Sequence, residues 1–89
     1  MTDVAIPRFK PGVRLSPRSN GREATLNAPE RVLVLDQIAE AIVSRIDGKS
    51  DAEAIARELC VYFQAPYDTV IADVKEFLGE LAAKGYVTL

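Results

Sequence analysis

The sequence contains no histidine and no tryptophan, and it has one methionine and one cysteine, Cys60. Because a structural zinc site takes about four nitrogen or sulfur ligands, this composition excludes an ordinary zinc site. Catalysis by Ser-His-Asp or Cys-His groups is excluded as well. A single cysteine cannot form a disulfide within the chain, so nothing indicates an oxidising compartment. We expect no catalytic residues and no metal or other cofactor.

Long apolar runs are also missing. No stretch approaches the ~18 apolar residues that cross a bilayer, and residues 1–10 lack the apolar run of a signal peptide. We therefore expect a cytoplasmic protein. The chain has 89 residues, of which 48% are apolar and 27% charged, which is typical of one small globular domain.

Charge is distributed unevenly along the chain. Residues 1–22 carry five basic side chains and one acidic one, a net charge of +4, whereas residues 23–89 carry six basic and twelve acidic ones, a net charge of −6. The overall charge of −2 disfavours nucleic acid as a partner. The basic segment either lies on an acidic helical body or attracts an acidic peptide or protein, and the sequence leaves both interpretations open.

The N-terminal part of the chain predicts an arm followed by strands. Residues 1–12 contain Pro7, Pro11 and Gly12 without a sustained period, which favours a flexible arm before a single domain over residues 13–89. From Val13 to Ser16 apolar and polar residues alternate, which predicts a first strand.

A three-stranded antiparallel meander is expected over residues 13–35. Ser19-Asn20-Gly21 predicts a tight turn, because Asn-Gly accepts the positive φ that hairpins need. Residues 23–26 form a weak second strand, and residues 27–30, which include a proline, form the next turn. Arg31–Leu35 is the strongest strand in the sequence.

Three helices are predicted after the strands. Asp36 is expected to cap the first, which ends at Asp47-Gly48, and Ser50-Asp-Ala-Glu53 reads as a capping box that opens the second. The third is expected from Pro66–Asp68 to Lys84, with Gly85 after its C-terminus. The apolar positions expected on the buried faces of the first two helices are Ile38, Ala39, Ile42, Ile46, Ile55, Leu59 and Tyr62. The predicted fold class is α+β, a meander followed by a three-helix bundle.

The third helix has an asymmetric apolar surface at about 100° per residue. A narrow apolar stripe is predicted to face the other helices, formed by Val70, Val74, Phe77 and Leu81. A shoulder widens this stripe on one side and comprises Ile71, Leu78 and Ala82, with Lys75 at its margin. The solvated face comprises Asp73, Glu76, Glu80 and Lys84.

The strand Val32-Leu33-Val34-Leu35 is the main candidate for function. Successive side chains point to opposite faces of a sheet, so this strand is apolar on both faces. As the third strand of a meander it is also an edge, and no internal charge, proline or glycine discourages pairing. An apolar edge beside a helix with an apolar shoulder fits a slot for an added strand. The alternative is that the first helix or a twin subunit covers both faces.

Other features favour ordinary structural roles. Cys60 is expected to be a small buried apolar residue. The pairs Asp36/Glu40 and Glu76/Glu80 are four residues apart on helices, which is typical of solvated faces. Aromatic residues around the break between the last two helices predict corner packing or an aromatic rim for a partner; they are Tyr62, Phe63 and Tyr67.

A winged helix-turn-helix protein that binds DNA would share this order of elements. Its recognition helix would be the third, which carries four acidic residues against two lysines. Acidic side chains would repel phosphates instead of replacing their counterions, so the charge argues against DNA binding.

Segments spread over most of the chain after residue 10 together resemble the PqqD family of pyrroloquinoline quinone (PQQ) biosynthesis. They are Pro11–Leu15, Ala28–Leu33, Leu35-Asp36, Ile38-Ala39, Asp47-Gly48, Ala72–Val74, Phe77-Leu78, Leu81 and Lys84–Val87. The resemblance implies a winged-helix-like peptide chaperone, a recognition element for ribosomally synthesised and post-translationally modified peptides (RiPPs). Such a protein would hold the precursor peptide PqqA and present it to the radical SAM enzyme PqqE for Glu–Tyr cross-linking.

The resemblance also implies the position of the peptide, as an extra strand on the third strand and against the third helix. Carried over to this chain, the peptide-binding residues are Arg31, Val32, Leu33, Val34, Leu35, Ile71, Lys75, Leu78 and Ala82. No nucleic acid or membrane partner is implied, and the protein is expected to be a monomer or a homodimer. The alternatives are a homodimeric adaptor of the same fold and a recognition element of another peptide-modification pathway.

Overall fold

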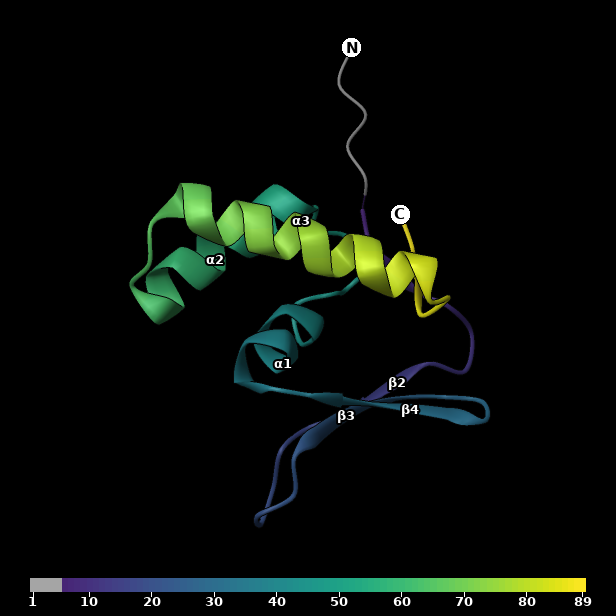
Figure 1. The fold of residues 1–89 in the computed structure, drawn as a ribbon. Helices are drawn as coiled ribbons and strands as arrows, with labels where there is room; N and C mark the ends of the chain where they lie inside the picture. The colour runs from purple at the N-terminus through teal and green to yellow at the C-terminus, as the bar shows by residue number, and fades with distance from the viewer. Residues whose placement is uncertain (1–5) are drawn as a thin grey trace.

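The computed structural model describes residues 6–89, and its elements form a small sheet covered on one side by helices (Figure 1). The main sheet is antiparallel with the order β2-β3-β4. Its strands are β2 (Arg14–Ser16), β3 (Ala24–Ala28) and β4 (Arg31–Leu35). The helices are α1 (Gln37–Val43), α2 (Ala52–Phe63) and α3 (Tyr67–Ala83). This arrangement confirms the predicted α+β class, a meander followed by three helices.

Two tight turns set the register of the meander. Asn20 and Gly21 both have positive φ, 45° and 79°, and Ser19 and Arg22 exchange backbone hydrogen bonds across them, as the Asn-Gly signal predicted. The next turn consists of Pro29 and Glu30 alone, because Ala28 pairs with Arg31. The second strand therefore continues to Ala28, two residues beyond the predicted end, since a two-residue turn suffices.

The first helix ends earlier than predicted. Asp36 caps α1 by accepting a hydrogen bond from the Ala39 amide at 2.8 Å, as expected. After Val43 the backbone bonds are of the shorter i→i−3 type, including that from the Ile46 amide to the Val43 carbonyl. The chain therefore turns at Ser44, four residues before Gly48, and Ile46 is buried from a position outside the helix.

The second helix begins one residue later than the capping-box prediction. The Asp51 carboxylate accepts a hydrogen bond from the Ala54 amide at 2.8 Å, so Asp51 is the N-cap. The Ser50 hydroxyl points instead to the Asp47 carboxylate at 3.5 Å. Ser50 is unavailable as a cap because the Asp47 side chain binds its amide and that of Lys49 in a turn of its own.

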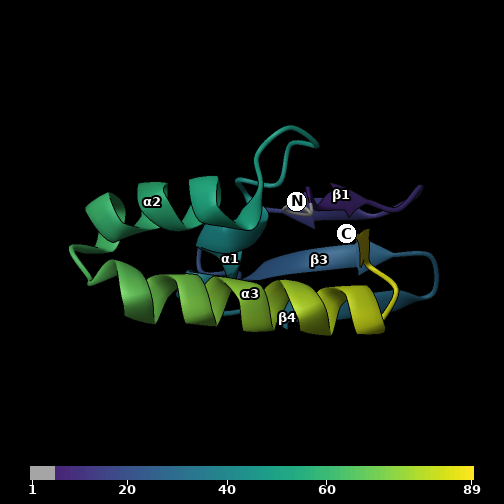
Figure 2. The same ribbon diagram turned by 90° about the horizontal axis from the view of Figure 1, so that it is seen from above.

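The third helix follows its prediction closely. Tyr67–Ala83 is helical, Lys84 is the C-cap, and Gly85 has a φ of 86° that suits glycine. The α2 and α3 helices lie side by side (Figure 2), and α1 lies between them and the sheet (Figure 1). The break between α2 and α3 is at Gln64, which adopts the left-handed conformation.

The core lies between the inner face of the sheet and the three helices. Its largest fully buried apolar side chains are Leu26, Leu35, Ile55, Leu59, Leu81, Val43, Val74 and Val87. Two residues predicted to be buried are exposed: Ile38 is 55% and Tyr62 61% exposed. The Tyr62 ring packs at the surface, edge-on to Phe63 with centroids 4.9 Å apart and 5.2 Å from the Arg45 guanidinium, so its hydroxyl stays in water.

The two ends of the described chain pair with each other. Strand β1 (Arg8–Phe9) is antiparallel to β5 (Val87–Thr88), and the Lys10 amide donates to the Tyr86 carbonyl at 3.1 Å. Residues 8–10, which lie in the segment predicted as a flexible arm, are thus held against the domain by backbone pairing. Residues 1–5 of that arm lie outside the described residues.

Candidate functional site

Strand β4 is an edge strand, and its outer face is apolar. It pairs with β3 on one side only, which confirms the predicted edge. Leu35 is buried and Leu33 is half-buried, whereas Val32 is 63% and Val34 58% exposed. Leu33 and Leu35 therefore face the core, and Val32 and Val34 face solvent. This alternation of two apolar sets is what the uninterrupted apolar sequence of the strand predicted. No helix covers the outer face within the described residues.

The register determines which backbone groups of β4 are free. Across a two-residue turn the flanking residues Ala28 and Arg31 form a hydrogen-bonded pair, and such pairs alternate along an antiparallel ladder. The N–H and C=O groups of Arg31, Leu33 and Leu35 therefore point toward β3, and those of Val32 and Val34 point outward. An added strand can form about four main-chain hydrogen bonds with these outward groups.

The outer face of the sheet changes character at β4. On β2 and β3 this face is polar: the Asn27 side-chain amide donates to Ser16 Oγ at 2.8 Å and to Thr25 Oγ1 at 3.2 Å. Thr25 and Asn27 stand directly opposite Val34 and Val32 in the register. The two valines are thus the only exposed large apolar residues on the described strands of this sheet. Apolar surface is concentrated at the edge.

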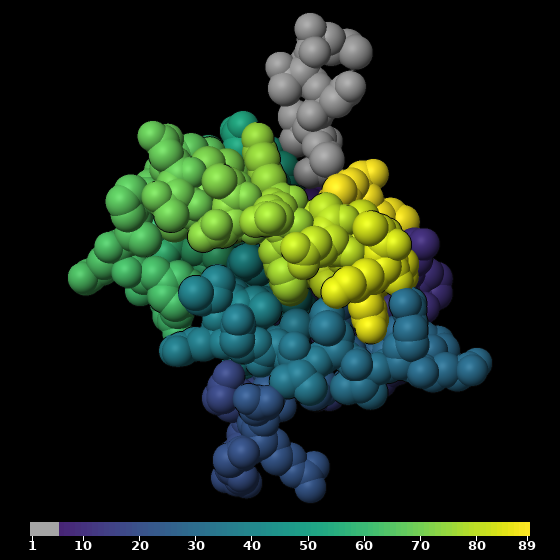
Figure 3. Space-filling model, in the orientation of Figure 1, coloured from purple at the N-terminus to yellow at the C-terminus, as the bar shows by residue number. Residues whose placement is uncertain are grey.

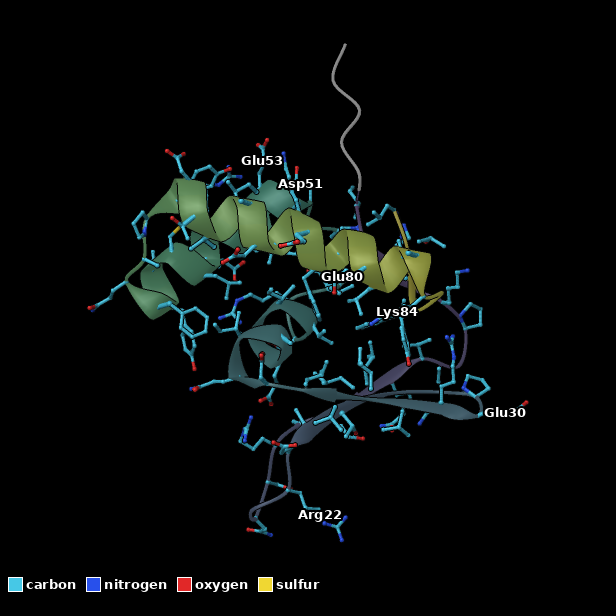
Figure 4. All side chains as sticks on the ribbon, viewed as in Figure 1. Arg22, Glu30, Asp51, Glu53, Glu80 and Lys84 are labelled. Carbon is cyan, nitrogen blue, oxygen red and sulfur yellow. The ribbon has the colours of Figure 1, made fainter. Side chains whose placement is uncertain are left out.

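Helix α3 lies above this edge and runs in the opposite direction to β4 (Figures 1 and 4). At one end the Arg31 guanidinium donates to the Lys84 carbonyl at 2.7 Å and stacks 4.7 Å from the centroid of the Tyr86 ring. These contacts fasten the start of β4 to the C-terminus of α3. Figure 4 shows Glu80 and Lys84 on the side of α3 that faces the sheet. The edge is therefore bordered by α3 along its length.

At the other end the edge leads to a pocket between α1 and α3. Its volume is about 360 Å³. Its lining residues are Asp36, Ile38, Ala39 and Ile42 from the α1 side, and Asp73, Glu76, Phe77 and Glu80 from α3. In the space-filling view, the α3 atoms and those of α1 and β4 meet along a line across this face (Figure 3). We call the open edge of β4 together with this pocket the β4–α3 groove.

The part of α3 that borders the groove differs from the predicted shoulder. On a helical projection of about 100° per residue, Ile71, Lys75 and Ala82 lie about 120–160° from Phe77, on one flank of the buried stripe. Asp73 and Glu80 lie about 40–60° from Phe77 in the opposite sense, on the other flank. Leu78 is only 2% exposed and belongs to the core. The structure thus brings Arg31–Leu35 to the groove but places the shoulder residues away from it.

Sequence reasoning missed the pocket residues for a specific reason. Phe77 was expected in the core stripe and the neighbouring acidic residues on a solvated face, because one helix alone cannot show which flank meets another element. Ile38, which is exposed in the structure, also lines the pocket. Its position fits the apolar period of α1, so the sequence predicts it to be buried. The order of the helices in space decides which flank of α3 faces β4.

The remaining candidate residues have structural roles or form surface contacts. Cys60 is half-buried and packs against the core, close to its expected role as a small apolar residue. Glu40 pairs with Arg18, with a nitrogen–oxygen distance of 3.6 Å, so it is part of a surface ion pair. Within residues 6–89, no group of three or more cysteine, aspartate or glutamate side chains is placed to hold a metal ion. No helix in the same range is long and apolar enough to span a membrane.

Comparison with known proteins identifies relatives over nearly the whole chain. Residues 13–87 match the family model described as "Coenzyme PQQ synthesis protein D (PqqD)". A protein of Rhizobium meliloti named "PqqA binding protein" is 34% identical over 80 residues, which cover 90% of this chain and 82% of that protein. A protein of the same name from Xanthomonas oryzae pv. oryzae is 37% identical over 89 residues, 100% of this chain and 97% of that protein.

Two solved structures share the fold. The solution structure of the PqqD truncation of Methylobacterium extorquens PqqCD is described as a functional and stand-alone RiPP recognition element. It matches with a TM-score of 0.80 and 32% identity, covering 93% of this chain and 88% of that one. The crystal structure of PqqD from Xanthomonas campestris matches with a TM-score of 0.60 and 35% identity, covering 86% of each chain.

Proposed function

This chain belongs to the PqqD family, and from that premise we propose that it is a peptide chaperone of PQQ biosynthesis that binds the precursor peptide PqqA as an additional strand on β4. The observation that supports this mode of binding is the free edge with its outward N–H and C=O groups at Val32 and Val34. The names of the relatives support PqqA as the ligand.

The groove provides two kinds of interaction for such a peptide. Main-chain hydrogen bonds contribute about 1 kcal/mol each and depend little on the sequence of the guest. Alternate side chains of the guest then point either toward α3 or toward the outer face beside Val32 and Val34. The first kind gives affinity, and the second gives register and selectivity.

The role after capture is presentation and not catalysis. In this proposal the chaperone hands PqqA to the radical SAM enzyme PqqE, which cross-links a glutamate and a tyrosine of the peptide. The chain itself has no histidine, so it lacks the Ser-His and Cys-His pairs of nucleophilic catalysis. The cytoplasm, where ribosomal peptides are made, is the compartment in which this role takes place.

Proline substitution at the edge tests strand addition. In Val34→Pro the outward N–H is lost, whereas the ladder to β3 is kept, since proline is tolerated on an edge whose N–H faces solvent. We expect Val34→Pro to stay folded and to bind PqqA about tenfold or more weakly in an NMR titration. Val34→Thr, which keeps the N–H and the branched shape, should bind within about threefold of the parent.

The same comparison is made at Val32, where Val32→Pro and Val32→Thr are the matched pair. If both proline variants are folded and bind PqqA as tightly as the parent, strand addition on β4 is wrong. The exposed Val32 and Val34 also fit an edge-to-edge homodimer, the alternative function as an adaptor. Sedimentation at low micromolar concentration separates the two, because a dimer that conceals the edge and excludes PqqA would contradict the proposal.

A further inference from the structure

The pocket at the end of the groove has an apolar floor under an acidic rim. Ile38, Ala39, Ile42 and Phe77 supply apolar surface, and Ile38 is 55% exposed. Four acidic residues, all of them exposed, also line the pocket: Asp36, Asp73, Glu76 and Glu80. None of the four forms an ion pair with a lysine or arginine of residues 6–89. Asp36 is engaged as the N-cap of α1, so the charges of Asp73, Glu76 and Glu80 are the ones that no ion pair of the described residues offsets beside the apolar surface.

The pocket is continuous with the edge to which a guest strand would add. Outward backbone groups occur at Val32 and Val34, and the next position in this two-residue period is Asp36, whose backbone is still extended with φ −76° and ψ −179°. A guest strand paired with Val32 and Val34 therefore reaches the mouth of the pocket when it extends by two more residues, to the position opposite Asp36. At its opposite end the groove is closed by the contact between Arg31 and the Lys84 carbonyl.

From this geometry we infer that the pocket is a subsite for a lysine or arginine side chain of the bound peptide. The methylene stem of such a side chain matches the apolar floor, and its cationic head reaches the carboxylates at the rim. An aliphatic side chain would leave the carboxylates desolvated without a partner, and an acidic one would be repelled. This inference rests on the proposed function, because the subsite is filled only when a strand is added to β4.

The two ends of the groove carry opposite charge. The start of β4 carries Arg31 with Lys84 nearby, and its end leads to the four carboxylates. A guest that runs antiparallel to β4 enters with its N-terminal residues at the acidic end. In such an antiparallel guest, the basic side chain in the subsite lies on the N-terminal side of the paired segment.

The test compares PqqA binding to two doubly neutralised variants. Glu76→Gln/Glu80→Gln removes two charges from the rim, and Glu53→Gln/Glu58→Gln removes two charges from exposed positions on α2, which does not line the pocket. We expect the first to weaken binding about tenfold and to reduce its dependence on salt, and the second to bind like the parent. Equal affinities of the two variants would overturn the subsite.

Substitutions in the peptide locate the partner of the rim. Each lysine or arginine of PqqA is replaced in turn by glutamine, and one replacement should cost about tenfold with the parent but little with Glu76→Gln/Glu80→Gln. If every replacement in the peptide weakens binding by the same factor with the parent and with Glu76→Gln/Glu80→Gln, the proposal is overturned. If Val34→Pro abolishes binding and the rim variant does not, only the subsite fails. If neither affects binding, strand addition on β4 fails with it.

Discussion

At the scale of single residues, the groove depends on where a few side chains point. Val32 and Val34 are exposed because the register turns Leu33 and Leu35 inward, and a slip by one residue would exchange the two pairs. Asp36 has two roles, since it caps α1 and stands at the mouth of the pocket. A substitution at Asp36 would therefore change both the helix and the groove, which makes Glu76 and Glu80 better probes of the pocket.

Asp47 provides a pH-dependent prediction that does not involve the groove. Hydrogen bonds from the Ser50 and Lys49 amides, each 2.8 Å long, lower the pKa of the Asp47 carboxyl below its ordinary value of 3.8. Because the folded-state pKa is lowered, this contribution to stability is present above pH 3.8 and is lost as the pH falls through the folded-state value.

Asp47→Asn keeps an oxygen acceptor but cannot ionise. We expect its free energy of unfolding in urea to fall less steeply than that of the parent as the pH is lowered below about 4. The exposed carboxyl of Glu23 serves as a control, and Glu23→Gln should keep the slope of the parent. An unchanged slope in Asp47→Asn would show that the two amide bonds do not favour the ionised form.

At the scale of elements, the start of α2 shows how the neighbouring residue Asp47 decides which side chain caps the helix. The sequence offers two adjacent cap residues, Ser50 and Asp51, and the turn formed around Asp47 assigns the role to Asp51. The helix then begins at Ala52, so Ile55 and Leu59 face the core.

Alanine substitutions distinguish the two caps. Asp51→Ala removes the acceptor for the Ala54 amide and is expected to lower the free energy of unfolding by about 1 kcal/mol. Ser50→Ala should cost less than about 0.5 kcal/mol, since the Ser50 hydroxyl caps no helix amide. Chemical denaturation of both variants checks this. A larger loss from Ser50→Ala than from Asp51→Ala would restore the capping box as the correct interpretation.

At the scale of the whole molecule, pairing of β1 with β5 brings the two ends of the domain together. Phe9 is half-buried against the core and pairs with Val87, which is 1% exposed. The segment before residue 13 therefore contributes to the fold, beyond the limit that its prolines and glycine suggested.

Phe9→Ala tests this contribution. Loss of a half-buried aromatic ring should lower the free energy of unfolding by about 2 kcal/mol. Lys10→Ala should have little effect, because Lys10 holds β5 through its backbone amide and not through its side chain. Urea denaturation measures both. Equal stabilities of the Phe9→Ala variant and the parent would favour the flexible arm.

Local signals account for the parts of the fold that sequence reasoning predicted well. Asn20-Gly21 predicted a turn because few other residues accept positive φ, and Asp36 and Gly85 marked helix ends for similar local reasons. The apolar run at Arg31–Leu35, placed third in a meander, predicted an edge strand, and the structure confirms it. Where two local signals competed, as at Ser50 and Asp51, the prediction missed by one residue.

The sequence by itself determined that β4 is apolar on both sides, because side chains alternate along any strand. Only the tertiary structure decided which flank of α3 stands over the edge. That choice depends on how α2 and the sheet pack against the buried stripe of the helix, a contact between residues far apart in the chain. Packing turned Phe77 and its acidic neighbours toward α1 at the end of β4, and it turned Ile71 and Ala82 to the other flank.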